Sequence, residues 1–93
     1  IFSGEEAVAL GLAARTSADP YADALSLARE IAGKSPDAIR AAKRLFEGAR
    51  TWDRAHTLRE ETREQVALIG SANQKEAIMA NLEKRGPRFA DPS

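Results

Sequence analysis

Large apolar residues recur every three or four positions along this chain, in segments that glycine and proline separate. This period places them on one face of an α-helix, and no segment has the clear two-residue alternation of a half-buried β-strand. The pattern predicts an all-α chain with an irregular or extended connector at 12–17. About five helices are expected, at Gly4 to Leu10, Pro20 to Ala32, Pro36 to Glu47, Trp52 to Ile69 and Gln74 to Arg85.

Polar residues mark the predicted helix starts. Two Ser/Asn-x-x-Glu capping boxes, in which the first side chain and the glutamate each bond the other's backbone N–H, are expected at Ser3-Glu6 and Asn73-Glu76. Two other helices are expected to begin at a capping residue followed by proline, at Asp19-Pro20 and Ser35-Pro36. Thr51 is the expected cap of the fourth helix.

Glycines mark the predicted helix ends. A residue in the left-handed conformation commonly ends a helix, and glycine adopts that conformation most easily. Five of the six glycines follow a helical segment and are expected in this role: Gly11, Gly33, Gly48, Gly70 and Gly86.

Each longer helix carries an apolar stripe that is expected to face a core. The side chains in these stripes are Tyr21, Leu25, Ala28, Ile31 and Ala32; Ile39, Ala42, Leu45 and Phe46; Trp52, Ala55, Leu58, Thr62, Val66 and Ile69; and Ala77, Ile78 and Leu82.

Composition predicts that this core is thin. The hydrophobic fraction is 43%, but 19 of these residues are alanine and only 18 are Leu, Ile, Val or Phe. Alanine favours helix but buries little area. A small chain with so few large apolar residues usually needs a partner surface or a second domain.

Charge and residue usage exclude several classes of function. The chain has 14 basic and 14 acidic residues, no cysteine and one histidine. This balance argues against nucleic acid or an anionic membrane as the main partner, and disulfides and cysteine- or multi-histidine-ligated metals are excluded. No apolar run approaches the roughly 20 residues of a membrane span. A nucleic-acid surface would have to use Arg40, Lys43, Arg44, Arg50 and Arg54, and is disfavoured.

No catalytic constellation is expected within these residues. His56 lies on a predicted helix without an identifiable catalytic partner. Glu60, Glu61 and Glu64 alternate with arginines, which is typical of a solvated helix face. The basic residues of the third helix, and Lys84, Arg85 and Arg88 near the end of the chain, are possible anion contacts. Dipole compensation explains Lys84 and Arg85 equally well.

The chain begins with Ile1-Phe2 and its only methionine is Met79. Such an apolar start without methionine predicts that these residues are a piece of a longer polypeptide.

Several short motifs, in order along the chain, resemble the enoyl-CoA hydratase/isomerase (crotonase) family. They cover essentially all 93 residues, and the last one is the most specific. The motifs are Phe2-Ser3-Gly4-Glu5-Glu6-Ala7, Ala9-Leu10-Gly11-Leu12, Leu27-Ala28-Arg29-Glu30-Ile31-Ala32, Ser35-Pro36-Asp37-Ala38-Ile39, Ala42-Lys43, Glu76-Ala77 and Glu83-Lys84-Arg85-Gly86-Pro87-Arg88-Phe89.

The resemblance implies that residues 1–93 are the C-terminal helical, trimerisation region of a crotonase-like fold, without the N-terminal ββα spiral domain. That domain carries the catalytic groups in the family, so the segment alone is expected to be inactive. The implied parent is a cytoplasmic hydratase or isomerase of fatty acid metabolism that acts on acyl-CoA as a homotrimer or hexamer, with no covalently bound cofactor. The alternative is a free-standing helical protein–protein interaction module.

One binding residue follows from the resemblance. Lys84 occupies the lysine of the Glu-Lys-Arg motif, which in the family contacts the phosphate or adenine end of CoA. The family often has an aromatic residue three positions earlier, where this chain has Asn81 and therefore no ring to stack on adenine.

Overall fold

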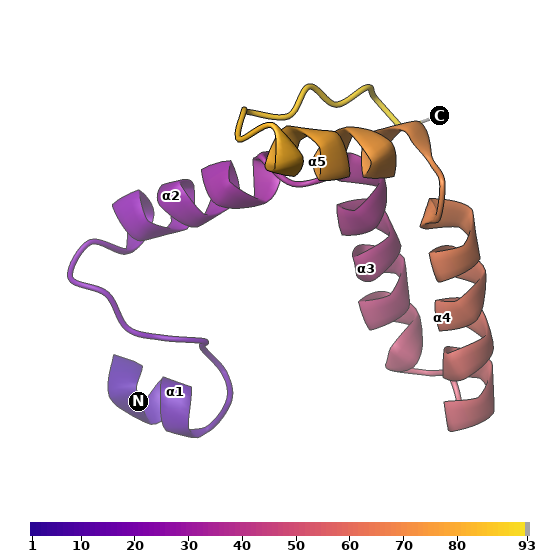
Figure 1. Ribbon diagram of the computed structural model, residues 1–93. Coiled ribbons are helices and arrows are strands. Elements are labelled where there is room, and N and C mark those ends of the chain that lie inside the picture. Colours follow the sequence, from indigo (N-terminus) through magenta and orange to yellow (C-terminus); the bar gives the residue numbers. More distant parts are fainter. Residues whose placement is uncertain (93) are drawn as a thin grey trace. The chain divides into compact units, whose positions relative to one another are not determined.

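The computed structural model describes residues 1–92 and is all-helical over that range (Figure 1). The helices are α1 (Gly4–Ala9), α2 (Pro20–Ala32), α3 (Pro36–Ala49), α4 (Arg54–Leu68) and α5 (Ala72–Leu82). The predicted all-α class and the five helices are therefore confirmed. The chain divides into two compact units, Ile1–Glu30 and the remainder from Ile31.

The first unit holds α1 and most of α2. Ser3 caps α1, and the reciprocal bonds of the capping box are present: the Glu6 N–H donates to Ser3 Oγ at 3.1 Å, and the Ser3 N–H donates to the Glu6 carboxylate at 2.9 Å. Asp19 Oδ1 accepts from the Ala22 N–H at the start of α2. Both predicted starts are confirmed. No residue of α1 or α2 is buried.

The second unit is built on a helical hairpin. In Figure 1, α3 and α4 run side by side in opposite directions, and α5 crosses the end of the hairpin where α3 begins and α4 ends. The segment after α5 returns along that helix and is held there by two hydrogen bonds between Asn73 and Ala90 and by one that the Arg88 N–H donates to Glu76.

The seam between α3 and α4 includes Ala42 and Leu45 of the predicted α3 stripe but none of the predicted α4 stripe. From α4 it presents Glu61, Glu64, Gln65 and Leu68, opposite Ala38, Ala41, Ala42 and Leu45 of α3. Apart from Trp52, the predicted α4 stripe is turned away from α3, and Leu58, Val66 and Ile69 are 52%, 67% and 64% exposed.

The same correction applies to the other predicted stripes. Only two apolar residues are buried between 1 and 92, Ala41 and Ala80. The large side chains of α2, Phe46 of α3, and Ile78 and Leu82 of α5 are exposed rather than in a core. A helix normally buries its apolar face against another element. The prediction of a thin core is confirmed, while the expectation that these large side chains face a core is wrong within residues 1–92.

Two predicted helix starts differ by a few residues. α4 is capped by Asp53, which accepts from the His56 N–H at 2.7 Å, and not by Thr51. α5 is capped by Ser71, which accepts from the Gln74 N–H, so Asn73 lies inside the helix and the second predicted capping box is wrong. The Asn73 side chain is used for tertiary contacts instead.

The prediction that glycines in the left-handed conformation end the helices is confirmed at two positions. Gly11 and Gly70 have φ values of +77° and +81°, whereas Gly33, Gly48 and Gly86 do not adopt positive φ. Gly48 lies within α3, which continues to Ala49. After α5 the left-handed residue is Lys84, two positions before the expected Gly86.

Gly48 is required by a close approach and not by its dihedral angles. A β-carbon there would lie 2.1 Å from the indole ring of Trp52. This ring also stacks on the His56 imidazole, with centroids 4.6 Å apart and planes 14° from parallel. Trp52 is thus packed over the last turn of α3 at the tip of the hairpin.

We expect Gly48→Ala to destabilise the fold by about 1–3 kcal/mol, because the cost of overpacking exceeds the roughly 0.5–1 kcal/mol that alanine gains in a helix. Urea unfolding followed by circular dichroism measures this change. Gly86→Ala is the control, since no atom approaches its β-carbon position within 4 Å. Equal or higher stability of Gly48→Ala would contradict the tight indole contact.

Candidate functional site

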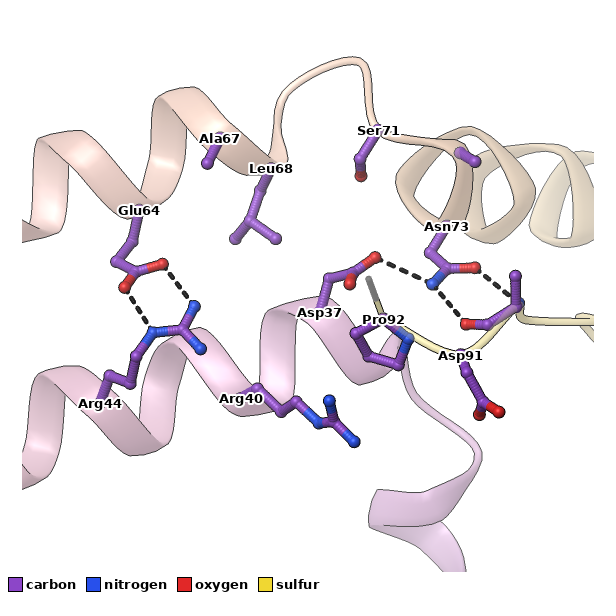
Figure 2. Close-up of a pocket in the computed structure, with 12 residues that line it drawn as sticks. Asp37, Arg40, Arg44, Glu64, Ala67, Leu68, Ser71, Asn73, Asp91 and Pro92 are labelled. Carbon is purple, nitrogen blue, oxygen red and sulfur yellow. Dashed lines mark hydrogen bonds and ion pairs between the residues drawn. The ribbon is translucent and has the colours of Figure 1, made fainter.

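The three helices of the second unit are joined by charged and amide groups. Arg44 of α3 and Glu64 of α4 form a bidentate pair, with Nε and Nη2 donating to the two carboxylate oxygens at 2.6 and 2.7 Å (Figure 2). Glu64 is only 8% exposed, so the expectation that it lies on a solvated face is wrong. The hydrogen bonds from Arg44 lower the pKa of Glu64, and Arg44 is thereby occupied within the fold.

Asn73 joins three segments through one amide. Its Nδ2 donates to Asp37 Oδ2 and to the Ala90 carbonyl, each at 2.8 Å, and its Oδ1 accepts from the Ala90 N–H at 2.9 Å (Figure 2). The residue is 4% exposed. A buried amide is stable only when its donors and acceptor are used, and both donors and the acceptor are used here. Asn73 therefore ties α5 to α3 and to the C-terminal segment.

A cavity of about 330 Å³ lies between these two contacts. Figure 2 shows residues of α3, α4 and the C-terminal segment around it. Its polar lining consists mainly of groups already bonded to one another, in the Arg44–Glu64 pair and the Asp37–Asn73 contact. Arg40 also lines the cavity and forms no side-chain hydrogen bond or ion pair within 1–92. No nucleophile paired with a base is present in this lining.

Lys84, the predicted binding residue, lies in the turn that ends α5. The Arg85 N–H donates to the Ala80 carbonyl and the Lys84 N–H to the Asn81 carbonyl, which is the bonding of a Schellman motif. Lys84 is its left-handed residue, with a φ of +54°. Glycine is usual at this position, and a side chain there costs about 1 kcal/mol. Lys84 is exposed, and its ammonium forms no ion pair or hydrogen bond within 1–92.

Glu76 and Arg85 hold this turn in place. Glu76 accepts two hydrogen bonds from the Arg85 guanidinium, at 2.6 and 3.2 Å, and a third from the Arg88 N–H at 2.9 Å. Arg85 Nε also donates to Glu83 at 2.5 Å. These bonds, chiefly that from Arg85 and then that from Arg88, lower the pKa of Glu76 to about 2.

The other sequence candidates do not gather around Lys84. Lys43 pairs with Glu47 on the same helix, and Glu60 pairs with Arg63. His56 is half-buried under Trp52, with its Nε2 3.7 Å from Glu60 Oε1. Within residues 1–92 no three acidic, cysteine or histidine side chains are grouped to hold a metal ion.

Sequence reasoning missed the structural use of Asn73 and of the Glu76–Arg85 pair. Asn73 and Glu76 have the spacing of a capping box, so the local sequence gave no reason to expect that either side chain contacts a distant segment. One feature of the sequence could have indicated this pair: Glu76 and the Glu-Lys-Arg motif both belong to the segments that resemble the crotonase family. The ion pair joins these two motifs across nine residues.

The fold is that of the C-terminal helical region of a crotonase-like protein. It matches the crystal structure of an enoyl-CoA hydratase from Polaromonas sp. JS666 with a TM-score of 0.81 and 26% sequence identity. The match covers 96% of this chain and 35% of that chain, so these residues span about a third of the hydratase's length. It confirms the predicted resemblance. No protein-family model and no curated protein matches the sequence. No helix within 1–92 is long and apolar enough to cross a membrane.

Replacing Asn73 is expected to release the C-terminal segment from α3 and α5. Asn73→Ala removes three hydrogen bonds and leaves the Ala90 N–H without its partner, at a cost of about 1–3 kcal/mol. Urea unfolding gives the loss of stability, and amide exchange at Ala90 reports the release. Asn81→Ala, an exposed change on the same helix, is the control. Unchanged protection at Ala90 would refute the tether.

The Glu76 contacts are expected to fail only in strong acid. A carboxyl whose pKa is lowered by folding stabilises the fold above its ordinary pKa of 4.5, and that contribution is lost as the pH falls toward 2. The carboxyl carbon of Glu76, followed by NMR, should titrate near pH 2, while its partner Arg85, whose pKa the ion pair raises, stays charged. A midpoint near 4.5 would show that the pair does not persist in solution.

Proposed function

We propose that residues 1–93 are the oligomerisation and pocket-closing region of an acyl-CoA-processing enzyme of the crotonase type. The observation that carries the proposal is the match to an enoyl-CoA hydratase over 96% of this chain. The reaction of the parent is hydration of an enoyl-CoA or movement of its double bond. The groups that catalyse it belong to a segment outside these residues, and the setting is cytoplasmic fatty acid metabolism.

The outward apolar stripes support the oligomerisation role. Phe46, Leu58 and Val66 are 76%, 52% and 67% exposed in this chain. Exposed apolar side chains on several helices of one small chain indicate a surface that is covered in the assembled protein. We assign these faces to the parent's own N-terminal domain and to neighbouring subunits of a homotrimer or hexamer.

Lys84 is proposed to bind the phosphates at the nucleotide end of CoA. Its ammonium is exposed and has no acidic partner within 1–92, and it lies in a turn that is fixed on both sides. A lysine used only to balance the α5 dipole would not require the left-handed conformation. An acyl-CoA substrate supplies the phosphate charges that this ammonium lacks in the chain itself.

The test is an assay of the native polypeptide that contains these residues. We expect it to convert an enoyl-CoA, followed by loss or shift of the absorbance of the conjugated thioester, and residues 1–93 alone to give no turnover. Lys84→Ala should raise KM for the acyl-CoA roughly tenfold with little change in kcat, because one charge-assisted contact is lost.

Lys75→Ala is the matched control, since Lys75 is also an exposed lysine but lies within α5 and not in the turn that follows it. Conversion of the substrate with an unchanged KM for Lys84→Ala would exclude the phosphate contact but keep the enzyme assignment. Absence of conversion by the native polypeptide, together with a stable oligomer of residues 1–93, would favour the free-standing interaction module instead.

A further inference from the structure

We infer that Glu76 is the positioning residue of the Lys84 turn: its contacts with Arg85 and Arg88 hold Lys84 in the left-handed conformation in which its ammonium meets the ligand phosphates. This inference rests on the proposed function of Lys84. Glu76 would thus affect the affinity for CoA although its carboxylate and the CoA phosphates are both negatively charged.

The first observation is the conformation of Lys84. It is the only residue besides glycine with a positive φ in the range 1–92. Strained backbone of this kind persists where surrounding contacts over-determine it, and it is concentrated at ligand-binding positions. Gly86 lies two residues further on and is not used for the turn, so the chain ends α5 with a charged side chain where glycine was within reach.

The second observation is the source of the restraint. Glu76 is two turns back in α5 and holds the chain on the far side of Lys84 at two points, the Arg85 guanidinium and the Arg88 N–H. Without these bonds Lys84 is restrained by the Schellman hydrogen bonds of the last helical turn and by the local Arg85–Glu83 contact, and last turns fray readily. The backbone between the fixed helix and the fixed Arg88 therefore has little freedom, and Lys84 lies within it.

Charge supports positioning rather than direct binding. Glu76 is negative and is already bonded to two arginine residues, so it would repel a phosphate that approached it. The only way in which it raises affinity is through the geometry of its neighbours. The lowered pKa of Glu76 keeps this contact intact throughout the neutral range.

The experiment is a double-mutant cycle on the native polypeptide with Glu76→Gln, Lys84→Ala and the pair, using acyl-CoA and the matching acyl-pantetheine thioester, which lacks the nucleotide phosphates. If Lys84 keeps its left-handed conformation in about a tenth of the Glu76→Gln molecules, KM for acyl-CoA rises about tenfold. KM for acyl-pantetheine, which lacks the nucleotide phosphates, stays unchanged. In the Lys84→Ala background the same change should have no further effect.

Glu60→Gln is the matched control, because it also breaks a glutamate–arginine pair but lies on α4. Arg85→Lys is a second variant that loses the bidentate contact while keeping the charge, and it should behave like Glu76→Gln. Equal losses for both thioesters would reduce Glu76 to a structural residue, and additive losses in the cycle would overturn its action through Lys84. If Lys84→Ala leaves KM for acyl-CoA unchanged, the proposed phosphate contact itself is refuted.

Discussion

The second unit depends on burying two polar side chains, and the rest of its structure follows from that constraint. Glu64 and Asn73 are the buried polar residues in 1–92, and the buried apolar residues are two alanines, Ala41 and Ala80. A buried carboxylate or amide is costly unless its partners are in place with good geometry. The positions of α3, α4 and α5 relative to one another are therefore those that let Arg44, Asp37 and Ala90 reach these groups.

The same logic extends to the C-terminal segment. Phe89 and Pro92 of this segment are half-buried, and hydrogen bonds to Asn73 at one point and Glu76 at another hold the segment along α5. Both anchors lie on α5, three residues apart, which places them almost one turn from each other on the same face. The two directional contacts set the direction of the segment along α5, and with it the Lys84 turn.

Sequence reasoning succeeded where the cause is local. Helical period, the Ser3 box and the glycines at Gly11 and Gly70 depend on neighbouring residues, and they were predicted correctly. It failed where the partner is distant or absent. The α4 stripe was assigned to a core because periodicity reports an apolar face without saying which element covers it. Glu64 follows Arg63, which looked like its local partner, and Lys84 adopts a conformation that sequence rules reserve for glycine.

In this chain the helices contact one another through polar side chains, while their apolar faces point outward, and this combination has a physical rationale. If the apolar stripes had been paired within the chain, the helices would have little surface left to bury against another domain or subunit. Hydrogen-bonded joints fix the angles between helices without consuming that surface, because their geometry is directional and their area is small. In the proposed assembly, the energy of association would come from faces such as those of Leu58 and Val66. Directional bonds thus specify the arrangement of the helices, and the proposed burial against a partner would stabilise it.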